Sequence, residues 1–151
     1  NSNAAREVAA TVLKTMGAEK HAEAYPYRLS GGQAQAIAIA RAIVSNPQLV
    51  LLDEPSSALD IVAQRELWIA LIKVISGSTA GFLLVTHDLD EAIMLADRVL
   101  VLSPRPGRIC DEIAIDLPRQ RAPSILSNPR FLELRARLAS SFESALSGEM
   151  R

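Results

Sequence analysis

The chain of 151 residues has little of what several protein classes depend on. Its single cysteine, Cys110, excludes an internal disulfide and any cysteine-based metal cluster, and it suits a reducing compartment. A net charge of −1 leaves no basic field for nucleic acid, so we expect no nucleic-acid partner. The longest apolar stretch, residues 34–44, is interrupted by Gln35 and Arg41 and is shorter than the ~20 residues that a membrane span requires. Any membrane role would therefore depend on another subunit.

The first segment that carries chemistry is residues 29–33, Leu-Ser-Gly-Gly-Gln. Ser30 can cap a helix, and Gln33 can return a hydrogen bond to the Ser30 amide, as in a capping box. Gly31 and Gly32 place no side chain in front of the first backbone N–H groups, so an anion can approach that end of the helix closely. In isolation, the pattern is equally well explained by a good helix cap.

The second segment is an apolar run that ends in two neighbouring carboxylates, Asp53 and Glu54. Such a run is typical of the end of a buried parallel strand. Adjacent carboxylates at a strand end point in different directions, which allows one to serve a metal ion and the other a water molecule. The alternative is a solvated turn after a strand.

In their order and spacing, these segments resemble the motifs of the nucleotide-binding subunit of ABC transporters. Residues 29–33 are similar to the family signature, and Asp53-Glu54 to the end of its Walker B strand. Ser57-Ala58-Leu59-Asp60 is similar to its D-loop, and Thr86-His87-Asp88 to its switch histidine. The resemblance runs from about Arg6 to beyond Leu138.

The resemblance implies ATP and Mg²⁺ as cofactors, bound in a complete dimer. Asp53 would help to hold Mg²⁺ through water, Glu54 would polarise the attacking water, and His87 would contact the terminal phosphate and sense its hydrolysis. This division suits phosphoryl transfer, in which the protein positions groups and stabilises charge. The residues expected to bind the nucleotide lie in the signature and the D-loop: Ser30, Gly31, Gly32, Gln33 and Asp60.

The resemblance also implies partners and a location. In the family, two subunits enclose two ATP molecules, each held by the phosphate loop of one subunit and the signature of the other. We therefore expect a second ATPase subunit in a homodimer and a transmembrane permease subunit. The chain would be peripheral, at the cytoplasmic face of the inner membrane. The stretch Ser-Pro-Arg-Pro-Gly-Arg-Ile at 103–109, with residues 115–119, resembles importers of nitrate, sulfonates, taurine and related solutes.

The sequence contains no G-x-x-x-x-G-K-[ST] phosphate loop, which in the family lies upstream of the signature. We therefore expect an α/β chain with a partial P-loop NTPase fold, the ABC ATPase fold, in which helices flank a parallel sheet and the N-terminal Walker A portion is missing. Residues 1–28 would end the helical subdomain, residues 29–118 would form the C-terminal part of the ATPase core, and residues 119–151 would be a helical extension.

Two consequences follow from the missing portion. The chain alone should bind ATP weakly or not at all and should hydrolyse it negligibly. In the family, a further strand lies between the strand that ends at His87 and the strand of residues 98–102. Its absence predicts self-association, a strand swap or a rearrangement around the gap, because unpaired edges and bare apolar faces favour such contacts.

Two alternative functions remain open at this stage. The chain could be a non-catalytic module that donates its signature helix in trans to a complete subunit. It could instead belong to a soluble ABC-type ATPase of DNA maintenance. Those proteins have long coiled-coil arms, and the sequence contains no sustained heptad pattern.

Hydrophobic periodicity also predicts which side chains are buried. The signature helix, residues 31–44, is apolar almost all round and is predicted to be mostly buried. The following helix is predicted to bury Ile61, Trp68, Leu71, Ile72 and Ile75, and the last helix Phe131, Leu134, Leu138 and Phe142. The arginines near the C-terminus are predicted to form a solvated basic face: Arg119, Arg121, Arg130, Arg135 and Arg137.

Overall fold

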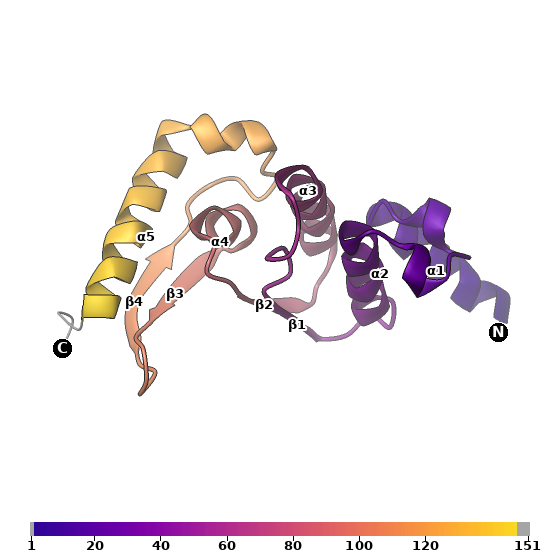
Figure 1. Ribbon diagram of the computed structural model, residues 1–151. Coiled ribbons are helices and arrows are strands. Elements are labelled where there is room, and N and C mark those ends of the chain that lie inside the picture. The colour runs from indigo at the N-terminus through magenta and orange to yellow at the C-terminus, as the bar shows by residue number, and fades with distance from the viewer. Residues whose placement is uncertain (1, 148–151) are drawn as a thin grey trace. The chain divides into compact units, whose positions relative to one another are not determined.

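The computed structural model describes residues 2–147. They form two compact units, one up to Val85 and one from Thr86 onward. Each unit combines helices with a two-stranded sheet, parallel in the first unit and antiparallel in the second (Figure 1). The predicted α/β class, with a parallel sheet and flanking helices, is confirmed. The boundary between the units falls inside residues 29–118, the segment predicted to form the core.

The first unit is mostly helical around one pair of strands. Its elements are α1 (Ser2–Thr15), η1 (Glu19–His21), η2 (Pro26–Arg28), α2 (Gly31–Ile43), β1 (Leu49–Asp53), α3 (Ile61–Gly77) and β2 (Gly81–Val85).

Short polar residues and glycine set the limits of the first unit's helices. Gly17 adopts a positive φ of 68° just after α1, a conformation that glycine reaches without steric cost. Asp60 caps the start of α3: its Oδ1 accepts hydrogen bonds from the amides of Val62 and Ala63, both at 2.9 Å.

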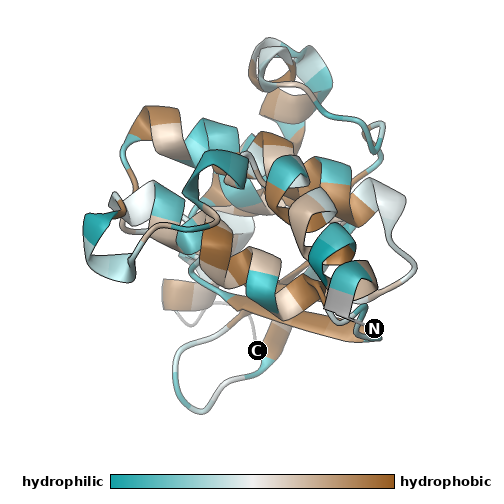
Figure 2. Ribbon diagram, turned by 90° about the vertical axis from the view of Figure 1, so that its right-hand side faces the viewer, coloured by the Kyte–Doolittle hydropathy of each residue, from teal (hydrophilic) through white to brown (hydrophobic). Residues whose placement is uncertain are grey.

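The two strands of the first unit have one buried face and one exposed face. Val50 and Leu52 are buried, whereas Leu49 and Leu51 are 57% and 65% exposed. On β2, Leu83 and Val85 are also more than half exposed, and Leu83 pairs directly with Leu51. The prediction of a buried strand is therefore correct for one face only. Among the described residues up to Val85, α3 covers one face of the sheet and no element covers the other (Figures 1 and 2).

The signature helix is less buried than its composition predicts. Only Ile39 and Ala40 of α2 are buried, because the helix packs against α1 and α3 along a narrow stripe. In α3 the predictions for Trp68, Leu71 and Ile72 are confirmed. The prediction for Ile61 is wrong, since this first residue of α3 lies 63% exposed.

The second unit packs a short and a long helix with an antiparallel strand pair. Its elements are α4 (Leu89–Leu95), β3 (Arg98–Leu102), β4 (Ile109–Ala114), η3 (Pro123–Ser127) and α5 (Pro129–Ser147). Its last two strands, β3 and β4, pair antiparallel. Helix α5 packs against α4 and both strands.

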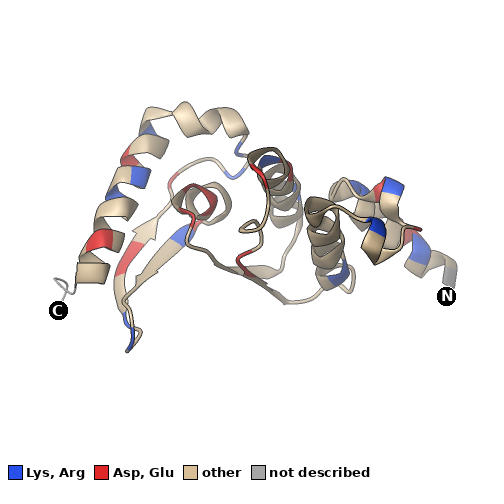
Figure 3. Ribbon diagram, viewed as in Figure 1, with Lys and Arg blue, Asp and Glu red and all other residues tan. Residues whose placement is uncertain are grey.

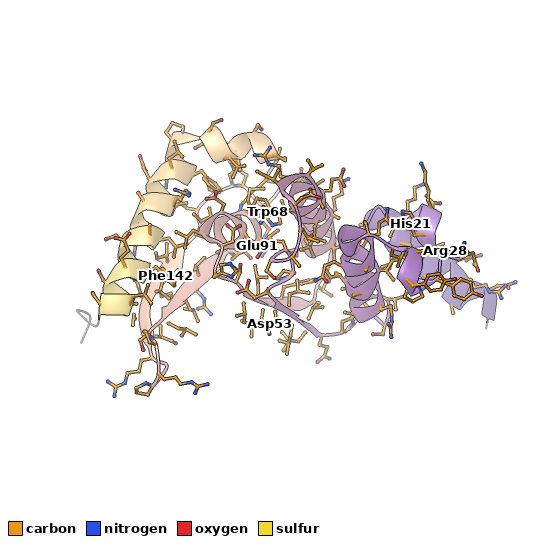
Figure 4. The ribbon with its side chains drawn as sticks, in the orientation of Figure 1. His21, Arg28, Asp53, Trp68, Glu91 and Phe142 are labelled. Carbon is orange, nitrogen blue, oxygen red and sulfur yellow. The ribbon has the colours of Figure 1, made fainter. Side chains whose placement is uncertain are left out.

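The core of the second unit lies between α4, α5 and the strands. Its most deeply buried side chains include Ile93, Ile113 and Phe131. Leu134 and Leu138 are also buried, as predicted, whereas Phe142 is 38% exposed on the last part of α5 (Figure 4). The periodicity of α5 therefore predicts its buried face correctly except towards its C-terminal end.

The prediction of a solvated basic face is wrong for Arg121, and it did not include the ion pairs of the other four arginines. Arg121 is buried, at 4% exposure. The other four arginines are partly exposed, but each forms an ion pair with an acidic residue of the same unit, and charges of both signs lie along α5 and the strands (Figure 3). These charges therefore hold α5 to its neighbours rather than forming a purely basic surface.

Candidate functional site

The tip of α2 has the predicted capping box. The Gln33 amide donates to Ser30 Oγ at 3.3 Å, and the Ser30 amide donates to Gln33 Oε1 at 2.9 Å. The first helical backbone bond runs from the Ala34 amide to the Ser30 carbonyl. The amides of Gly31 and Gly32 therefore precede the helical ladder and belong to the group of first-turn donors that can bind an anion.

The tip of α2 lies against the start of α3. A Cβ built on Gly32 would lie 3.1 Å from Ala63 Cβ, and one built on Gly31 would lie 3.9 Å from Leu59 Cδ2. The signature glycines and the segment ending at Asp60 therefore come together within one unit. Asp60 itself is engaged as the cap of α3, so any contact it makes with a ligand would be additional to that role.

The two carboxylates lie at the end of β1 and at the start of a backbone turn that the sequence does not reveal. Asp53 is the last residue of β1 and is exposed (Figure 4). Glu54 has a positive φ of 48°, its amide donates to the Val85 carbonyl at 2.8 Å, and its carbonyl accepts from the Ser57 amide and hydroxyl. A left-handed conformation at a glutamate costs about 1–3 kcal/mol and is typical of functional sites.

Ser56 is a supporting residue that the sequence analysis missed. It is 2% exposed, and its hydroxyl accepts a hydrogen bond from Gln64 Nε2 of α3 at 3.2 Å. Its carbonyl accepts from the Leu59 amide at 3.1 Å. These bonds hold the segment between Glu54 and Asp60 on α3. The only signal in the sequence was the position of a serine between the two candidate motifs.

A cavity of about 460 Å³ opens beside the tip of α2, within the first unit. Ser30, Gly32 and Gln33 form part of its wall, and α1 and α3 contribute Lys14 and Lys73. The lining therefore combines first-turn residues of a helix with two lysines and one carboxylate, that of Glu66. This combination is compatible with an anionic ligand.

His87 lies at the beginning of the second unit, immediately before the cap of α4. Asp88 is that cap, and its Oδ1 accepts from the amides of Asp90 and Glu91 at 2.8 and 3.1 Å. The Asp88 amide in turn donates to Thr86 Oγ1 at 3.0 Å. The backbone on both sides of His87 is therefore fixed by side chains, so its position depends on that of α4.

The donor set suits a magnesium ion that is shared with a ligand. Among residues 2–147, no group of three or more His, Cys, Asp or Glu side chains is placed to hold a metal ion. Mg²⁺ is commonly bound by only one or two carboxylates, with substrate phosphates and water completing its shell. An exposed carboxylate such as Asp53, at the end of β1, fits that arrangement. No helix in the same residues is long and apolar enough to cross a bilayer.

The sequence profile of the family described as "ABC transporter" matches residues 1–57. The chain is 47% identical over 134 residues to the aliphatic sulfonates import ATP-binding protein SsuB 1 of Pseudomonas fluorescens. This match covers 89% of this chain and 50% of that protein. It is 39% identical to the taurine import ATP-binding protein TauB of Escherichia coli O157:H7, covering 85% of this chain and 52% of that protein. The chain thus spans about half the length of the curated relatives it matches.

Solved structures have the same fold over the matched region. The ATP-binding cassette MJ0796, solved as a dimer in a post-hydrolysis state with ADP and Pi, matches with a TM-score of 0.62 and 32% identity. The match covers 75% of this chain and 48% of that one. An inward-facing metal-chelate type ABC transporter matches with a TM-score of 0.63 and 30% identity, covering 85% and 47%.

Proposed function

Because the chain belongs to the ATP-binding family of ABC transporters, we propose that it contributes one part of an ATP-hydrolysing importer subunit. The observation that carries the proposal is the capped, glycine-bearing tip of α2 against the start of α3, beside a cavity with two lysines. In the proposed site, the ligand is ATP with Mg²⁺ and the phosphates face the amides of Gly31 and Gly32. The site is complete only in an assembly that also supplies a phosphate loop.

The roles of the side chains follow from the chemistry of phosphoryl transfer. Ser30 and Gln33 shape the tip of α2, and Asp60 holds the adjoining segment next to the nucleotide. Asp53 would hold Mg²⁺ through water, and the ion would supply positive charge to the phosphates. Glu54 would accept a proton from the attacking water. His87 contacts the terminal phosphate. The positive φ of Glu54 supports this assignment, since strain of that kind is typical of functional residues.

The proposed partners are a second ATPase subunit and a transmembrane permease subunit, at the cytoplasmic face of the membrane. The relatives named for sulfonate and taurine import support a small sulfonate-like solute. A relative solved as a dimer supports the paired ATPase. In this arrangement residues 1–28 end the helical subdomain, residues 29–118 belong to the ATPase core, and residues 119–151 form an extension.

The test mixes the chain with a complete relative, the taurine ATP-binding protein, and measures ATP hydrolysis. We expect the wild-type chain to change the turnover of the relative in a dose-dependent way, because its α2 tip competes for or completes the shared site. Gly31→Glu, which places a carboxylate before the phosphates, should abolish this effect. Gly107→Glu is the matched control, since nothing lies within 4 Å of a Cβ there.

The direction of the change separates the two forms of the proposal. Inhibition of ATP hydrolysis by the relative indicates that the chain enters the shared site but cannot complete it. Increased turnover favours the alternative of a module that donates its signature helix in trans. Equal effects of wild type and Gly31→Glu, or no effect of either, would contradict the proposed nucleotide site.

A further inference from the structure

Arg121 is the most deeply buried cation among the described residues of the second unit, and no step of the proposed reaction uses it. Its Nη1 donates to the carbonyls of Ile93 and Ala96, both at 2.7 Å, and to that of Met94 at 3.1 Å. These three carbonyls belong to the C-terminal end of α4 and the residue that caps it. A cation at a helix C-terminus satisfies carbonyls that have no helical partner and interacts favourably with the helix dipole.

The same guanidinium also contacts its own segment. Nε donates to the Pro118 carbonyl at 3.0 Å and Nη2 to the Leu117 carbonyl at 3.3 Å. Arg121 therefore joins the beginning of the C-terminal extension to the end of α4. Burial lowers the pKa of Arg121, but an arginine stays protonated in proteins. Such a buried charge is tolerated because its donors are matched by several carbonyls.

A second arginine of the extension holds the other end of α4. Arg135, on α5, donates through Nε to Asp90 Oδ1 at 2.6 Å. Asp90 lies in the first turn of α4, and its amide donates to the cap residue Asp88. His87 is the next residue towards the N-terminus. The C-terminal extension thus contacts α4 at both ends, within one unit.

Helix α4 needs these contacts because it has only seven residues. A helix of two turns is not stable by itself in water, so its position is decided by tertiary contacts. We propose that Arg121 and Arg135 are positioning residues for His87, acting through the two ends of α4. The functional consequence of this positioning rests on the proposed role of His87. It would make the C-terminal extension a structural support of the switch histidine.

The experiment uses the fact that the chain contains two histidines, His21 and His87, which belong to different units. Proton NMR of the whole chain, without nucleotide, resolves the ring signals of each. The variants are Arg121→Met, Arg121→Lys and Arg135→Gln. Arg130→Gln is the matched control, because Arg130 also lies on α5 and pairs with Asp116 and Glu133, away from α4.

We expect Arg121→Met and Arg135→Gln to displace the Hε1 signal of His87 by more than its line width and to leave that of His21 in place. Arg121→Lys should return the signal part of the way, because lysine keeps the charge and donates to the same carbonyls. Arg135→Gln serves as the independent variant should Arg121→Met fail to fold, which the loss of dispersed signals would reveal.

Two results would overturn the proposal. One is an unmoved His87 signal in folded Arg135→Gln. The other is an equal displacement by Arg130→Gln, which would indicate a general effect of charge. The measurement does not depend on nucleotide, so it stays informative if the proposed ATP site fails its own test.

Discussion

Gly31 and Gly32 are neighbours of the same type in different surroundings. A Cβ on Gly31 would make an ordinary contact with Leu59, whereas a Cβ on Gly32 would lie 3.1 Å from Ala63 Cβ on another helix. Replacing a helical glycine by alanine raises the free energy of unfolding by about 0.5–1 kcal/mol where the backbone conformation permits alanine. Forcing two helices apart costs about 1–3 kcal/mol.

We therefore predict different effects of the two substitutions on stability. Gly31→Ala should raise the free energy of unfolding by about 0.5–1 kcal/mol. The free energy of unfolding of Gly32→Ala should be about 1 kcal/mol or more lower than that of Gly31→Ala. Urea denaturation followed by the fluorescence of Trp68, in the same unit, measures both. A Gly32→Ala chain as stable as Gly31→Ala would mean that α2 and α3 adjust without cost.

Asp111 shows how one hydrogen bond makes stability depend on pH. The Ser141 hydroxyl donates to its carboxylate at 2.6 Å and lowers the pKa of Asp111; burial raises this pKa, and the Glu112 amide and Arg137 lower it. Because the folded pKa lies below the ordinary 3.8, this contribution to stability is present above that value. It is lost as the pH falls through the folded pKa.

We predict that Ser141→Ala lowers the urea midpoint of the second unit at pH 6 and that this difference shrinks as the pH is brought below about 4. The carboxylate is partly exposed, so the effect should be at most about 1 kcal/mol. Ser140→Ala, at the exposed neighbouring position, is the control and should change little. A Ser141→Ala deficit that is the same at pH 6 and pH 3 would contradict this account.

At the scale of elements, the β1–β2 pair presents an apolar face that a stable monomer would normally cover. Leu49, Leu51, Leu83 and Val85 are each more than half exposed, and the carboxylate of Asp53 is the only charge from the two strands on the same face. We propose that a second copy of this chain covers the face, because a largely uncharged surface of paired leucines is self-complementary.

The prediction is that the chain self-associates and that charges on this face prevent it. Leu51→Lys combined with Leu83→Glu places opposite charges on directly paired residues, which preserves the strand pair while making the face polar. Sedimentation at increasing concentration should show a monomer for this variant and larger species for the wild type. Leu132→Lys, on the exposed side of α5, is the control. A wild-type chain that stays monomeric throughout would contradict the prediction.

At the scale of the whole molecule, the 151 residues contain only part of the proposed nucleotide site. The sequence has no phosphate loop, so the proposed site lacks the backbone donors and the lysine that this loop would supply to the phosphates. We predict that calorimetric titration of the isolated chain with ATP and Mg²⁺ shows weak binding or none, and that turnover is negligible. Micromolar or tighter binding would show that the chain completes a site by itself.

Local signals in the sequence were sufficient for the helix caps. Ser30 with Gln33, and glycine at position 17, act through bonds and backbone angles within a few residues, so no distant contact is needed to predict them. The antiparallel pairing of β3 with β4 was likewise predictable, because a short turn joins two alternating strands.

Other features depended on which elements meet in space. Periodicity shows that a residue is apolar or charged, but Leu51 is exposed because no described element of its unit covers that face. Arg121 is buried because the carbonyls at the end of α4, more than twenty residues earlier, match its donors. The left-handed turn at Glu54 depends in the same way on the Val85 carbonyl of the neighbouring strand. A hydrogen-bond partner distant in the chain leaves no pattern around the residue it binds, and so only the tertiary structure decided these three.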